Sequence, residues 1–162
     1  LIHAYFLCLI KSDEVDSYNA ILQELIENLD KTTSDFGVEL QGRCRALYEA
    51  YVNRDGEMAF AIIDKTIKDS AAPIYALQDK FDICEKLHEL EEMEKVIKEL
   101  CDLNVGDSYG KERALYREKL LYAAYRKDDT ELNKLKNEIN NKNIRINMDI
   151  LQRKIERIMS AN

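Results

Sequence analysis

One spacing recurs along the chain and limits its possible folds more than any other feature. Leu22, Ala59, Val96 and Leu132 follow one another at steps of 37, 37 and 36 residues, each about one turn into an amphipathic helical segment. A period of this length is typical of stacked helix pairs, in which neighbouring pairs bury the apolar faces that a single pair leaves exposed. The spacing therefore predicts an all-α array of about four antiparallel helix hairpins.

Composition agrees with a helical chain. Five Gly and one Pro among 162 residues are too few for a fold rich in turns, and helix-forming residues fill the long segments. No apolar run approaches the roughly 18 residues that a membrane-spanning helix needs. The first ten residues, LIHAYFLCLI, are apolar on nearly all sides and lack an initial Met, which predicts a buried helix and an excerpt of a longer chain. We expect no sheet and no membrane association.

Apolar periodicity and polar breaks place the individual helices. We predict a repeat domain over residues 1–141 and a separate C-terminal helix within 142–162. Gly56, in the break after Asn53, is expected at positive φ, and Gly106 is expected to stop a helix. The expected helices are 1–11, 13–29, 36–51, 57–69, 73–87, a return to 103 after a turn at 91–92, 109–127, 132–139 and 144–158.

The last helix carries a different pattern. Its apolar residues step by four and three over two heptads, at Ile144, Met148, Leu151, Ile155 and Ile158. A seam of this kind packs a helix onto a flank of the preceding hairpin, as terminal units of stacked arrays require, or begins a helical stalk. The two interpretations are a capping helix and a linker to another domain or to a second copy of the chain in a dimer.

The four cysteines fall on apolar helical faces. Cys8, Cys44, Cys84 and Cys101 are therefore expected to be buried, reduced thiols, and a cytoplasmic location follows from that expectation. The best candidate metal ligands are Cys84 and His88, one turn apart on one helix face, with Cys101 of the antiparallel partner helix as a third candidate. Because no fourth ligand accompanies them, we predict no metal site.

Beyond the spacing itself, the hairpins resemble the tetratricopeptide repeat family in divergent form over residues 1 to about 140. Tyr51-VNRDGEM-Ala59 matches the family's aromatic residue, short turn and small residue, and Tyr125-RKDDTE-Leu132 and Leu87-HELEEMEK-Val96 match more loosely. The resemblance implies a right-handed superhelix whose concave groove is lined by the first helix of each pair. The positions that it places near this groove are Tyr48, Tyr51, Glu85, His88, Leu121 and Ala124, with Tyr122 and Tyr125 as equal candidates.

No catalytic pattern is present. Gly37 and Gly42 have the outer spacing of a phosphate-binding loop, but Arg43 and Cys44 follow where Lys and Ser or Thr are needed. The clustered glutamates near residue 91 are expected on a solvated helix face, because acid–base catalysis needs an enclosed site. We predict neither an enzyme nor a cofactor.

A basic and aromatic stretch over residues 109–127 is the strongest functional signal. One interpretation is ordinary packing of the tyrosines with solvated cations; the other is capture of an acidic peptide, a phosphate or a single strand of nucleic acid. The net charge of −7 argues against nucleic acid. Its members are Lys111, Arg113, Arg117, Lys119, Arg126 and Lys127 with Tyr109, Tyr116, Tyr122 and Tyr125.

These observations predict a protein- or peptide-binding or sensing module with a partner that carries acidic groups. The predicted partner-binding residues are Tyr48, Tyr51, His88, Arg117, Tyr122, Tyr125 and Arg126. The alternative is a sensory segment of a larger bacterial signalling protein, such as a diguanylate cyclase or a histidine kinase, that passes a signal through the C-terminal helix.

Overall fold

The computed structural model describes residues 2–104 and 108–161, and every regular element in those two ranges is helical. This confirms the all-α class for the part of the chain that is described. None of the helices there combines the length and the apolar character that crossing a bilayer demands. The elements are α1 (Ile2–Ile10), a 3-10 turn η1 (Val15–Tyr18), α2 (Asn19–Asp30), α3 (Asp35–Tyr48), a π turn η2 (Glu49–Asn53), α4 (Gly56–Asp69), α5 (Ile74–Leu87), α6 (Leu90–Asp102), α7 (Ser108–Tyr125), α8 (Asp129–Asn141) and α9 (Met148–Ser160).

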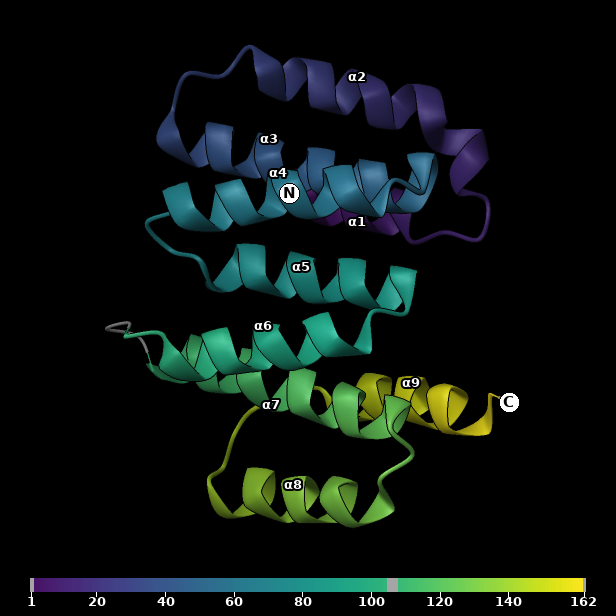
Figure 1. Cartoon of the computed structure of the whole chain (residues 1–162), viewed down its shortest axis with the longest axis vertical. Coiled ribbons are helices and arrows are strands. Elements are labelled where there is room, and N and C mark those ends of the chain that lie inside the picture. Colours follow the sequence, from purple (N-terminus) through teal and green to yellow (C-terminus); the bar gives the residue numbers. More distant parts are fainter. Residues whose placement is uncertain (1, 105–107, 162) are drawn as a thin grey trace. The chain divides into compact units, whose positions relative to one another are not determined.

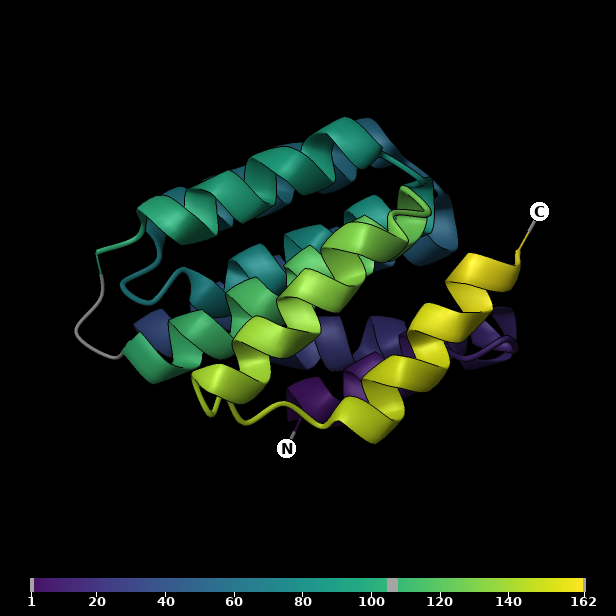
Figure 2. The same cartoon turned by 90° about the horizontal axis from the view of Figure 1, so that it is seen from below.

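The chain divides into two compact units, Leu1–His88 and Glu89–Asn162. In the first unit α3 is the central helix, since it packs against α1, α2, α4 and α5, and α2 to α5 follow one another in order in Figure 1. In the second unit α7 packs against α6, α8 and α9. Figure 2 shows the non-helical connection at residues 142–147, which leads from α8 to α9.

The first unit has a continuous apolar core contributed by all of its α-helices. Phe6 and Ile10 of α1 are fully buried, although α1 is so short that packing rather than intrinsic propensity must hold it. The other fully buried members of this core are Leu22, Cys44, Ala46, Leu47, Ala50, Ala59, Ile63, Ala76 and Ile83.

Three of the turns between successive helices share one backbone conformation. Arg54, His88 and Lys127 are left-handed, with φ of 57°, 59° and 56°. Each is followed by the residue that caps the next helix, and these caps have φ/ψ of −95°/92°, −92°/79° and −95°/83° at Asp55, Glu89 and Asp128. The aspartate caps accept backbone N–H groups of Met58 and Glu131, which satisfies donors that a helix start leaves open. The same turn geometry therefore recurs at three places along the chain.

This shared turn corrects the register inferred from the sequence. The fourth residue after the cap is Ala59 in α4, Met93 in α6 and Leu132 in α8, and all three side chains are buried. Val96 is also buried, but it lies one helical turn later than the equivalent position. The chain turns at His88 and Glu89 rather than at residues 91–92, so the repeat is less regular than the predicted steps.

Other local predictions were partly wrong. Gly56 does not have a positive φ; Arg54 takes the left-handed position instead, two residues earlier. Ile144 is buried but precedes the last helix, which begins at Met148. Gly106 lies outside the described residues. The division between a repeat domain and a C-terminal helix at residue 141 stays a prediction.

Candidate functional site

Two of the three predicted partner-binding residues of the first unit, Tyr48 and Tyr51, have structural partners. Tyr48 is nearly buried, and its hydroxyl donates to Asn19 Oδ1 and accepts from the amide of Gln23. The Tyr51 hydroxyl donates to the backbone carbonyl of Asp82 at 3.3 Å. His88 is exposed in its left-handed turn. Of these three residues, Tyr48 is buried, Tyr51 is half-buried and His88 is exposed.

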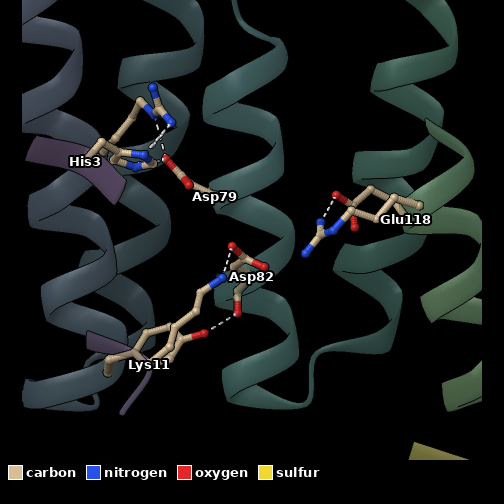
Figure 3. A network of polar contacts seen from close by, with 8 residues as sticks. His3, Lys11, Asp79, Asp82 and Glu118 are labelled. Atoms are coloured by element: carbon tan, nitrogen blue, oxygen red, sulfur yellow. Dashed lines mark hydrogen bonds and ion pairs between the residues drawn. The ribbon is translucent and has the colours of Figure 1, made fainter. Parts of the chain in front are cut away.

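The predicted residues of the second unit lie on α7 and, in the case of Arg126, in the turn directly after it. The Tyr122 hydroxyl donates to Glu94 Oε2 of α6 at 3.3 Å, and the Arg126 guanidinium lies 5.6 Å from the ring centre of Tyr122. Partial burial, reinforced by the Glu94 carboxylate, raises the pKa of Tyr122. Arg117 pairs with buried Glu118 (Figure 3), and Tyr125 is half-buried. Of the positions that family register placed near a groove, Glu85, Leu121 and Ala124 are buried.

Two lysines of the basic stretch donate hydrogen bonds to backbone carbonyls at the C-terminal ends of helices. Lys127 Nζ donates to the carbonyls of Ile158, Met159 and Ala161 at 2.7, 2.8 and 2.7 Å, at the C-terminus of α9. Lys111 donates to the carbonyls of Cys101 and Leu103 at the end of α6. Helix C-termini leave carbonyls without intrahelical partners and carry partial negative charge, so both contacts are stabilising. The side chain of Tyr109 lies outside the described residues.

Sequence reasoning missed a buried polar network in the first unit. Arg43 Nε of α3 donates to Asp79 Oδ2 of α5 at 2.6 Å, and His3 Nε2 of α1 lies 3.2 Å from the same oxygen (Figure 3). A second contact in the same figure joins Lys11 to Asp82. Two acids flanking the core residue Phe81 were the available signal, but helical periodicity alone assigns such acids to solvent.

The thiols do not share one environment. Cys44 and Cys84 are buried as predicted, whereas Cys8 and Cys101 are exposed, so the prediction of four buried thiols was wrong. Burial is the main reason that the pKa of Cys44 rises to about 12, with the Asp79 carboxylate adding to it. In residues 2–104 and 108–161 no three His, Cys, Asp or Glu side chains are grouped as a metal ion would need.

A cleft between α3 and α4 is the clearest candidate binding site. It has a volume of about 780 Å³, within the range of roughly 300–1,000 Å³ typical of ligand pockets. Phe36 and Val38 of its wall are 72% and 53% exposed. The remaining lining residues are Asp35, Glu39, Gln41, Gly42, Ala61, Ile62, Lys65, Thr66, Asp69, Ala71 and Ala72.

Small side chains explain why the cleft is hollow. Gly42 of α3 faces Thr66 of α4 so closely that a Cβ at residue 42 would lie 2.2 Å from Thr66 Oγ1. The glycine therefore permits the two helices to approach, which accounts for one member of the phosphate-loop spacing noted in the sequence. Ala61, Ala71 and Ala72 also line the cleft with small side chains. A close approach of α3 and α4 and small side chains in the lining therefore go together in this cleft.

Comparison of this chain with protein-family models, curated proteins and solved structures finds no match in any of the three.

Proposed function

We propose that the chain is a protein- or peptide-binding module and that the α3–α4 cleft receives the partner. The observation that carries the proposal is the exposure of Phe36 and Val38 at the wall of a cleft of about 780 Å³. Burying a Phe side chain completely contributes roughly 1.5–3 kcal/mol. Because Phe36 is 72% exposed, about 1–2 kcal/mol of this remains for a partner to gain.

The polar groups of the cleft favour binding over catalysis. The Thr66 hydroxyl donates to the Ile62 carbonyl at 2.9 Å, and Glu39 accepts from the Ser70 hydroxyl at 2.7 Å. A nucleophile and a base within hydrogen-bond reach of each other would be needed for covalent chemistry. The lining supplies carboxylates, one lysine and this engaged hydroxyl, a set suited to orienting a bound segment.

The shared hairpin turns support a tetratricopeptide-like repeat as the scaffold. Left-handed Arg54, His88 and Lys127 recur in the same turn, as expected if each hairpin is one copy of a unit. A right-handed superhelix of about four such hairpins is part of the proposal. Repeat arrays of this kind commonly present extended binding surfaces, which is consistent with the proposed task.

A blocked cleft tests the proposal. A random peptide library displayed on phage is selected on the whole chain and, separately, on Ala61→Trp, in which an indole occupies the cleft. Ala20→Trp is the matched control, since Ala20 is also an exposed helical alanine of the first unit but does not line the cleft. We expect peptides that bind the unmodified chain and the control but not Ala61→Trp.

Removing the exposed aromatic ring gives the quantitative version of this test. Phe36→Ala should raise the Kd of a selected peptide by about 5- to 30-fold, from the 1–2 kcal/mol above. Tyr5→Ala is the control, because Tyr5 is 49% exposed on α1 and lies outside the cleft. Equal binding by Ala61→Trp and the unmodified chain would show that the cleft is not the binding site.

A further inference from the structure

We infer that the partner of the α3–α4 cleft is a basic amphipathic peptide segment, with a Lys or Arg side chain next to apolar residues. This inference rests on the proposed function and adds the chemistry of the partner. It is carried by the charge of the cleft together with its apolar wall. The sequence had instead suggested an acidic partner for α7, so the two sites would recognise opposite charges.

Carboxylates outnumber cations in the cleft. Its acidic lining residues are Asp35, Glu39 and Asp69, and its basic lining residue is Lys65. Glu39 is partly neutralised, since its Oε1 lies 4.0 Å from Arg43. Asp35 and Asp69 are exposed, and within the described part of the chain neither takes part in an ion pair. These two carboxylates therefore remain available to a cation of the partner.

The helix that carries Asp69 adds to the negative potential. Asp69 is the last residue of α4, and the final carbonyls of an α-helix carry a partial negative charge equivalent to about half an elementary charge. An acid at this end of a helix opposes the helix dipole, so its presence lowers rather than raises the stability of α4. A cation bound near Asp69 would offset the repulsion between its carboxylate and the negative end of the α4 dipole.

The dimensions of the cleft suit a short segment. Its lining covers residues 35–42 of α3 and 61–69 of α4, each about 10–12 Å along a helix axis. That length accommodates roughly two helical turns or three to four extended residues. Apolar side chains of such a segment would contact Phe36 and Val38, and one basic side chain would reach Asp35 or Asp69. An acidic segment would meet repulsion from the same carboxylates.

Charge neutralisation tests this inference separately from the cleft itself. Peptides selected on the whole chain and lost on Ala61→Trp are synthesised with a fluorophore, and their Kd is measured by anisotropy. The double variant Asp35→Asn/Asp69→Asn should raise the Kd of a basic peptide about 3- to 10-fold, as expected for two exposed charge pairs. Glu24→Gln/Glu27→Gln, on the exposed face of α2, changes the net charge equally and should leave the Kd within twofold.

Two further measurements test the charge inference: the dependence of binding on ionic strength and the charge of the selected peptides. Raising the ionic strength should weaken binding to the unmodified chain and have less effect on the aspartate double variant. Cleft-dependent peptides without enrichment in Lys or Arg, or an unchanged Kd in the double variant, would overturn the charge inference and leave the proposed function standing. If no selected peptide binds the unmodified chain more tightly than Ala61→Trp, both the proposed function and the charge inference are overturned. Equally tight cleft binding by a cationic surfactant such as dodecyltrimethylammonium would overturn the assignment to a peptide.

Discussion

The contact between Gly42 and Thr66 permits a prediction in which the sign of a mutational effect reverses. Gly→Ala within a helix normally stabilises it by about 1 kcal/mol. At residue 42, however, the added Cβ would lie 2.2 Å from Thr66 Oγ1 and 3.3 Å from both Thr66 Cβ and Cγ2. Thr66 cannot simply rotate away, because its hydroxyl donates to the Ile62 carbonyl and its β-branched side chain has few alternatives.

The expected magnitude follows from two opposing contributions. Overpacking of a close contact costs roughly 1–3 kcal/mol, which exceeds the gain in helix propensity. Gly42→Ala alone should therefore lower the free energy of unfolding by about 1 kcal/mol, or the Tm by roughly 2–4 °C. In a Thr66→Ala background the hydroxyl and methyl group are gone, and the same substitution should stabilise by about 0.5–1 kcal/mol.

Urea unfolding of the four chains in this double-mutant cycle measures the effect. The predicted coupling energy between residues 42 and 66 is about 1.5–2 kcal/mol. If Gly42→Ala stabilises the chain to the same degree in both backgrounds, α3 and α4 are not in the close contact described here. The cleft that these two helices form would then lose its structural basis, and so would the proposed binding site.

Four further predictions address the buried network, the end of α9, the reactivity of the thiols and the pH dependence of stability. Asp79→Ala should destabilise the chain by about 3 kcal/mol in urea unfolding, because it leaves a buried guanidinium without its closest carboxylate. Lys127→Met should cost only about 1 kcal/mol but speed amide hydrogen exchange in the last turn of α9, whose carbonyls the lysine holds. In the native chain Ellman's reagent should titrate Cys8 and Cys101, with the other thiols reacting after unfolding. Because burial raises the pKa of Cys44 to about 12 while the unfolded thiol ionises near 9, its contribution to stability should fall as the pH rises from 9 to 12.

Periodicity was sufficient to find the helices of the described chain but not their exact register. The polar break at residues 53–56 lies where the sequence placed it, since a capping Asp beside Gly disfavours continued helix. Backbone geometry within a break is not encoded by glycine alone, and here Arg54 takes the left-handed conformation. Met93 and Ala59 are each the fourth residue after a helix cap, but the sequence pattern aligned Val96 with Ala59 instead. Val96 lies one turn after Met93 and is buried to the same degree, so apolar periodicity does not distinguish the two.

Burial on each helix was less predictable, because an apolar stripe does not show how many of its members a neighbour covers. Phe36 belongs to the stripe of α3 that includes Leu40, yet it lies in the first turn and remains exposed. Cys8 of α1 is also exposed, although Phe6 and Ile10 of the same helix are fully buried. Conversely, Asp79 and Asp82 are buried and paired with cations distant in the sequence, Arg43 of α3 and Lys11 directly after α1, and no local pattern shows such long-range pairing.

The candidate site illustrates a more general limit of sequence patterns. Patterns detect side chains that are present, and they directed attention to the cations of residues 109–127, of which Lys111 and Lys127 donate to helix carbonyls. A cleft forms where side chains are too small to fill the space between helices. Gly42 and Ala61 have no special pattern in the sequence, and only the packing of α3 against α4 shows that they line a cleft. The useful signal was the combination of small residues on two helices with an apolar residue that remains uncovered. Only the packing of α3 on α4 distinguishes that combination from an ordinary core stripe.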